Sequence, residues 1–215
     1  MGARYRVPVT GFQAFTTITN TDNKQLNGVS YMSEENTTST THALIFELEY
    51  VAAQARRVEF EAIKSAVSTK GVELTPIMFS RSSMSPLHRA AVTDVLLRAG
   101  KKADAIEKAV AEVDKTVTNY CANEAELDAG LAKLIKATQE RGIPVVTFTA
   151  LPKSDAKALM AKLGLDELGV ELIMPEEVKD SFPRADDWLK MLKQCNKEQS
   201  TLVAVVSSQV ACKGA

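Results

Sequence analysis

The clearest hydrophobic pattern in the chain is a run of four apolar residues, 43–46, that follows a tract of Thr, Ser and Asn. Such a run predicts a buried strand of a parallel sheet. Two acids, Glu47 and Glu49, come directly after it, and helical spacing begins near Gln54. Because open α/β sheets bind ligands at the carboxyl ends of their strands, this acid pair is the first candidate for chemistry.

Later apolar stretches predict the rest of the fold. Residues 143–149 and 201–206 are further buried strands, and 170–174 is a shorter strand candidate. Helical spacing predicts helices over residues 54–70, 86–98, 103–120, 124–139, 153–163 and 181–195, and another that starts at 209. Prolines and a polar Ser-Arg-Ser-Ser cluster indicate a loop over 72–85. The pattern is that of an α/β protein with a block of helices after its first strand.

The first 41 residues differ from the remainder. Polar residues dominate 16–41 and show no apolar period. Segments of this kind bury too little surface to offset the entropy of ordering, so we expect residues 1–41 to form a flexible polar extension. A few apolar residues offer the alternative of an added strand or a contact with a partner: Val7, Val9, Phe12 and Phe15.

Composition narrows the class of protein. The chain has 215 residues, of which 45% are hydrophobic and 25% charged, with a formal net charge of -1. This balance predicts no binding to nucleic acid or to anionic membranes. No apolar run reaches the ~18 residues that a membrane span needs, and the N-terminus lacks a secretory pattern, so we expect a cytoplasmic protein. The scattered Cys121, Cys195 and Cys212 fit buried thiols in a reducing compartment, and His42 and His88 fit surface or packing positions.

The stretch around the acid pair resembles the first motif of the haloacid dehalogenase (HAD) superfamily, chiefly phosphatases and phosphomutases. That motif is a hydrophobic strand ending in Asp-x-Asp-Gly-(Thr or Val). Glu47 and Glu49 stand at its two Asp positions, Tyr50 stands at the Gly position, and Val51 matches. The region of the third family motif also matches at Pro183, Asp186, Trp188 and Leu189. The order of these features is closest to that of β-phosphoglucomutase-like members with a helical cap.

The resemblance implies a Rossmannoid parallel sheet flanked by helices, with an all-helical cap inserted after the first strand. We expect the HAD-like core over residues 42–55 and 142–215 and the cap over 56–141. A complete family core would continue beyond Ala215 into at least one more strand, so the C-terminal part of the core is expected to be missing, or its edge to be closed differently. If the strand is absent, the sheet edge near Val203 is open to another chain.

The resemblance also implies a set of phosphate-binding residues. Thr149 falls on the second motif, where a hydroxyl and the backbone hold a phosphoryl oxygen, and Ala150 follows it. The third motif of the family contains a lysine that neutralises charge, but this chain has Phe182 there. Lys153 and Lys179 are the candidate substitutes.

Metal binding is implied only in a weakened form. The fourth family motif supplies acidic magnesium ligands, whereas this chain has Val206 and Ser207 in those positions. The implied metal ligands are therefore Glu47, Glu49 and Ser207. Since Mg²⁺ demands near-octahedral oxygen ligands and a hydroxyl is a poor replacement for a carboxylate, we expect no cofactor unless an active site retains Mg²⁺.

These departures lead to three hypotheses about function. The first is a HAD-like pseudoenzyme that binds a small phosphorylated ligand or a protein, because phosphoryl transfer depends on positioning and charge neutralisation. The second is a divergent hydrolase of small phosphorylated metabolites, with Glu47 as nucleophile or metal ligand, Glu49 as acid/base, Thr149 as phosphate clamp and a lysine as charge partner. The third is a subunit of a larger assembly whose residues 1–40 order on a partner.

Overall fold

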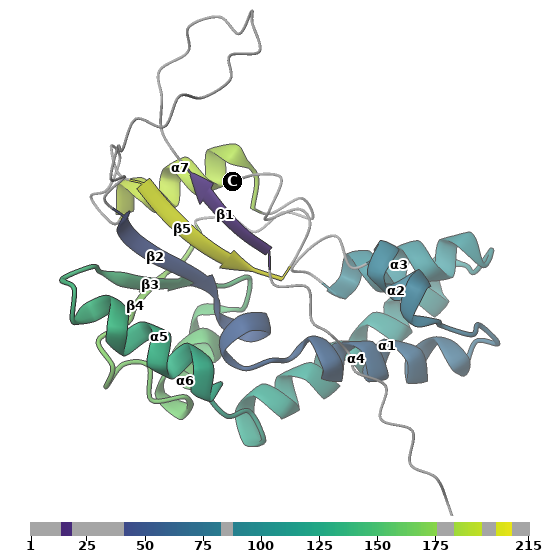
Figure 1. Cartoon of the computed structure of the whole chain (residues 1–215). Helices are drawn as coiled ribbons and strands as arrows, with labels where there is room; N and C mark the ends of the chain where they lie inside the picture. The colour runs from purple at the N-terminus through teal and green to yellow at the C-terminus, as the bar shows by residue number, and fades with distance from the viewer. Residues whose placement is uncertain (1–13, 19–40, 83–87, 176–182, 195–200, 208–215) are drawn as a thin grey trace, which may run out of the picture.

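The computed structural model describes residues 14–18, 41–82, 88–175, 183–194 and 201–207. A five-stranded sheet forms one part of the molecule, and a group of helices lies beside it (Figure 1). The strand order is β1-β5-β2-β3-β4. The strands are β1 (Ala14–Ile18), β2 (Thr41–Glu47), β3 (Val145–Phe148), β4 (Glu171–Ile173) and β5 (Thr201–Val206). Four of them are parallel, and β1 runs antiparallel to β5, so the predicted α/β fold with a parallel sheet is confirmed.

Strand β2 lies in the middle of the sheet, parallel to both of its neighbours. Ile45 pairs with Val146 of β3 on one side and with Ala204 of β5 on the other. Residues 43–47 are all buried. A central parallel strand is covered on both faces, which explains why its sequence is a continuous apolar run and not an alternating one.

Helices cover the two faces of the sheet. On one face α5 (Ala129–Gln139) and α6 (Lys153–Lys162) pack with Phe46 and Val145 in a large apolar cluster. On the other face α7 (Ala185–Gln194) closes a second cluster, in which Trp188 meets Phe148 edge to face at a centroid distance of 5.2 Å. The predicted positions of these three helices agree with the structure to within a few residues.

The other helices come between β2 and β3 in the chain and pack against one another. They are α1 (Arg56–Ser68), α2 (Pro76–Ser82), α3 (His88–Arg98) and α4 (Ala103–Asn123). Figure 1 shows them beside the sheet, with α1 and α4 side by side. We refer to α1 to α4 as the helical cap; α5, in contrast, packs on β3 in the sheet layer.

The prediction of a loop over residues 72–85 was wrong in part. Helix α2 begins at Pro76 and ends at Ser82. Proline is favoured at the first helical position, because the N–H that it lacks has no partner there and its φ is already helical. The short helix places Phe79 edge to face against Phe60 of α1, with ring centroids 5.1 Å apart.

The extension predicted over residues 1–41 contains a strand. In β1, Phe15 pairs with Val205 and Thr17 with Val203, so this strand covers the edge of β5 that the sequence left open. The edge is thus closed in a different way, by a segment from the other end of the chain. Residues 1–13 and 19–40 and the helix expected from residue 209 lie outside the described residues. Within the described part of the chain, none of the helices has both the length and the apolar character of a membrane span.

Candidate functional site

Three neighbouring parallel strands end at the same edge of the sheet. Glu47 is the last residue of β2, Thr149 and Ala150 follow β3, and Ser207 follows β5. The parallel register of β2 with β3 and with β5 brings these positions together. Together with Glu49, they are the part of the predicted site that the fold assembles.

Glu47 is fixed by the end of β5. Its side chain is 1% exposed, and its Oε2 accepts hydrogen bonds from the backbone N–H of Ser207 at 2.8 Å and from the Ser207 hydroxyl at 2.5 Å. Hydrogen bonds to a carboxylate are roughly twice as strong as neutral ones. One oxygen of Glu47 is therefore already bound by the protein itself.

A single buried turn of π-helix, η1 (Leu48–Ala52), follows Glu47 directly. The Ala53 N–H donates to the Leu48 carbonyl, and the Ala55 N–H donates to the Glu49 carbonyl at 2.9 Å. π-Helical turns are rare, and those that do occur are often found at functional sites. This turn places the side chain of Glu49 against the residues that follow β3.

The Glu49 carboxylate accepts hydrogen bonds from donors that follow β3. Its Oε1 accepts from the backbone N–H of Ala150 at 3.1 Å, and the Thr149 hydroxyl also donates to its carboxylate. Burial raises the pKa of Glu49 to about 7; the hydrogen bond from Thr149 opposes this shift, and the charge of Glu47 adds to it. Thr149 in turn accepts from the Leu151 N–H at 2.9 Å. The donors expected to hold a phosphoryl oxygen are thus bound to a carboxylate of the chain.

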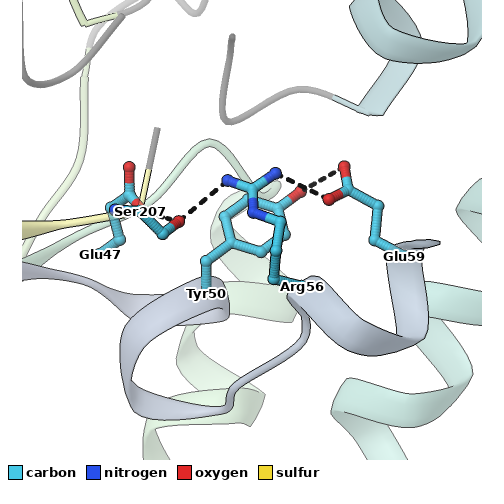
Figure 2. Close-up of polar contacts among 5 residues, drawn as sticks. All are labelled: Glu47, Tyr50, Arg56, Glu59 and Ser207. Carbon is cyan, nitrogen blue, oxygen red and sulfur yellow. Dashed lines mark hydrogen bonds and ion pairs between the residues drawn. The ribbon is translucent and has the colours of Figure 1, made fainter. Parts of the chain in front are cut away.

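The site also contains a cation, Arg56, that is not among the predicted residues. Figure 2 shows Arg56 between Ser207 and Glu59. Its Nη1 is 2.7 Å from Glu59 Oε2, and its Nη2 donates to the Ser207 hydroxyl at 2.9 Å. The guanidinium carbon lies 3.5 Å from the ring centroid of Tyr50, whose hydroxyl donates a long hydrogen bond of 3.4 Å to Glu59.

The charges around Arg56 stabilise its ionised form. Burial by itself lowers the pKa of the guanidinium, but the negative charges of Glu59 and Glu47 outweigh it and the pKa lies above its usual value. Burial raises the pKa of Tyr50, and the charge of Glu59 raises it further. Arg56 Nε is buried and has no hydrogen-bond partner among the described residues. An Arg and a Glu three residues apart at the start of a helix was the sequence signal for this pair.

Of the two predicted lysines, the structure describes only Lys153. Lys153 is the first residue of α6 and is exposed, and the hydrogen bonds of the described residues do not connect it to either acid. Lys179 and Phe182 lie outside the described residues. The cation that the structure places beside the acids is therefore Arg56, from the beginning of the helical cap.

The described residues do not fit a magnesium site. The Ser207 hydroxyl donates to Glu47, the Glu49 carboxylate faces the Ala150 N–H, and Arg56 brings a positive charge to the same place. Mg²⁺ needs several oxygen ligands in near-octahedral geometry. Across the described ranges, acids, histidines and cysteines do not come together in any group of three or more that could hold a metal ion.

The parallel sheet with covering helices and a helical insertion after the motif-bearing strand defines a HAD-like α/β fold. Comparison of the coordinates with solved structures supports this class, because HAD family IA proteins are similar to this chain. No protein-family model matches the sequence, and no curated protein matches it either. The likeness is therefore structural.

Three solved structures illustrate it. A HAD hydrolase of family IA, variant 3, from Entamoeba histolytica is 15% identical, with a TM-score of 0.51, and the match covers 72% of this chain and 70% of that one. A β-phosphoglucomutase from Clostridium difficile is 14% identical, with a TM-score of 0.55 and coverage of 73% and 72%. A predicted phosphoglycolate phosphatase from Haemophilus somnus is 14% identical, with a TM-score of 0.54 and coverage of 74% and 73%. At such low identities the structural similarity shows the fold alone, and the activity has to be argued from the site.

Proposed function

We propose that this HAD-like protein does not catalyse phosphoryl transfer and that it acts by binding a small phosphorylated ligand or a protein. One observation carries the proposal: the Glu49 carboxylate accepts from the Ala150 N–H and from the Thr149 hydroxyl, the donors that the family resemblance assigns to a phosphoryl oxygen. A phosphoryl group would have to displace a carboxylate that is buried and already hydrogen-bonded. Displacing such contacts costs binding energy that a catalytic site needs for its transition state.

The position of Glu47 supports the same proposal. A glutamate carries its carboxylate about 1 Å farther from the backbone than an aspartate, and a misplacement of that size can cost roughly a hundredfold in rate. Ser207 also donates two hydrogen bonds to this carboxylate, which makes it a weaker nucleophile. Phosphoryl transfer depends on positioning and on charge neutralisation, so both changes act against turnover.

A second candidate function is a divergent hydrolase of small phosphorylated metabolites. The observation in its favour is the pKa of Glu49, which burial raises to about 7. A general acid or base works best when its pKa is near the working pH. In this case Glu47 would be the nucleophile, Glu49 the acid/base and Thr149 the phosphate clamp.

Calorimetric titration with Mg²⁺, with and without beryllium fluoride, separates the two candidates. We expect no binding that saturates, and no hydrolysis of sugar phosphates in the presence of Mg²⁺. Saturable binding that beryllium fluoride strengthens, together with turnover that is lost in Glu47→Ala, would overturn the proposal. Glu61→Ala, which changes an exposed glutamate of α1, is the matched control and should leave any turnover unchanged.

A cytoplasmic location and the absence of nucleic-acid partners are part of the same proposal. The near-neutral formal charge of -1 supports the second point, because nucleic-acid binding depends on clustered positive charge. The buried free thiol of Cys121, which is 5% exposed, is in keeping with a reducing compartment.

A further inference from the structure

We infer that Arg56 is the resident cation of the acid site, a guanidinium built into the chain that neutralises buried acids. This role does not depend on whether the protein turns over a substrate.

The need for a cation follows from the burial of three acids. Glu47, Glu49 and Glu59 are exposed by only 1%, 4% and 0%. Buried carboxylates have to be paired, strongly hydrogen-bonded or protonated. Glu49 meets this need through its donors and its raised pKa. Glu59 and Glu47 meet it through Arg56, the first directly and the second across the Ser207 hydroxyl.

The surroundings of this side chain suit a guanidinium and not an ammonium group. The flat face of Arg56 stacks on the Tyr50 ring, while its two terminal nitrogens diverge to Glu59 and to Ser207 (Figure 2). A lysine has one compact charged group, so it cannot contact both partners and stack on the ring at the same time. The ring that the guanidinium contacts belongs to Tyr50, which stands at the Gly position of the HAD motif.

The same contact joins two parts of the fold. Arg56 is the first residue of α1, at the start of the helical cap, and Ser207 follows β5 in the sheet. The two residues are 151 positions apart in the chain. The resident cation therefore also holds the beginning of the cap against the strand ends.

Thermal unfolding of an Arg56→Ala variant, with and without about 20 mM methylguanidinium chloride, tests the inference. The Arg56 side chain is 20% exposed, but its partner Glu59 is fully buried, so removing the cation leaves a buried carboxylate unpaired and should lower the Tm by roughly 6 to 20 °C. The small guanidinium should then enter the vacated space and raise the Tm of the variant by about 3 °C or more over NaCl of equal ionic strength. The unaltered protein should show no such rise, because its own side chain fills the space.

Arg57→Ala is the matched control, because it removes the neighbouring, exposed arginine of the same helix. The Arg57→Ala variant should have nearly the Tm of the unaltered protein, and methylguanidinium should not raise that Tm. If Arg56→Ala does not fold, Arg56→Met and Arg56→Lys replace it. Both should be less stable than the unaltered protein, and Arg56→Lys should be more stable than Arg56→Met.

An Arg56→Met variant as stable as the unaltered protein would overturn the inference, and so would a methylguanidinium effect of equal size in Arg56→Ala and Arg57→Ala. These results are separate from those of the magnesium titration. Turnover or Mg²⁺ binding by the unaltered protein would contradict the proposed function, while the inference about Arg56 depends only on the stability of its variants.

Discussion

At the scale of single residues, the two acids of the site are bound by the chain itself. The Glu49 side chain extends from the π-helical turn to the Ala150 N–H, and Glu47 reaches the backbone and hydroxyl of Ser207. Each contact occupies a hydrogen-bond donor or acceptor at the carboxyl ends of the strands.

The pKa of Glu49 predicts a pH dependence of stability. Because burial raises this pKa from 4.5 to about 7, the folded protein holds the proton more tightly than the unfolded chain. The stabilisation is complete below pH 4.5 and is lost as the pH rises to about 7. Glu49→Gln removes the ionisation, so we expect the variant to match the original protein near pH 4.5 and to exceed it at pH 8 by up to about 3 kcal/mol.

Urea unfolding of both proteins at a series of pH values measures this difference. Glu171→Gln, a change at an exposed glutamate of β4, is the control and should give a curve parallel to that of the original protein. A constant difference between Glu49→Gln and the original protein from pH 4.5 to 8 would show that Glu49 has an ordinary pKa.

At the scale of secondary-structure elements, the least expected feature is β1. Its five residues pair antiparallel with β5, and Ala14 to Ile18 oppose Val206 to Leu202. An edge strand presents unpaired N–H and C=O groups that can pair with another chain. β1 gives the edge of β5 a partner from within the same molecule.

A deletion of residues 1–40 should therefore expose the edge of β5. We expect a Tm lower by a few degrees and concentration-dependent self-association, measured by thermal unfolding and by light scattering on a gel-filtration column. A deletion of residues 1–13, which leaves β1 in place, is the matched control and should behave like the full chain. If both deletion variants stay monomeric and equally stable, β1 does not protect the edge.

At the scale of the whole molecule, cap and sheet share one hydrophobic core. A single cluster of buried residues contains Ile63 of α1 and Val113 of α4 as well as Phe46 of β2 and Leu159 of α6. The ion pair of Arg56 and the hydrogen bond from the Tyr120 hydroxyl to the Ala53 carbonyl, at 2.8 Å, lie at the same junction. Apolar contact that continues across two structural parts favours one cooperative unit.

Unfolding in urea should consequently be a single transition for both parts. Fluorescence of Trp188, the chain's only tryptophan, reports on the sheet and α7, whereas circular dichroism at 222 nm reports largely on the helices, including those of the cap. We expect the two probes to give the same midpoint and the same slope. Two separate midpoints would mean that the cap and the sheet unfold independently.

From the sequence alone, four of the five described strands, most helices and the edge of the sheet that carries the site can be predicted. Apolar runs identify β2, β3 and β5, and residues that end neighbouring parallel strands must meet at one edge, which brings Glu47, Thr149 and Ser207 together. The strands can be predicted because their apolar residues are neighbours in the chain. The place of the site follows from the geometry that every parallel sheet shares. Helix α2 is not predicted, because a proline indicates a loop as readily as the first residue of a helix, which is its place here.

Which groups the acids bind depends on the tertiary structure. Arg56 and Ser207 are 151 positions apart and Glu49 and Ala150 are 101 apart, so no local pattern pairs them. The pairing of β1 with β5 is likewise a contact between segments that are far apart in the chain. Hydrogen bonds and ion pairs act over a few ångströms, and such distances between residues far apart in the chain exist only once the sheet and the cap have packed.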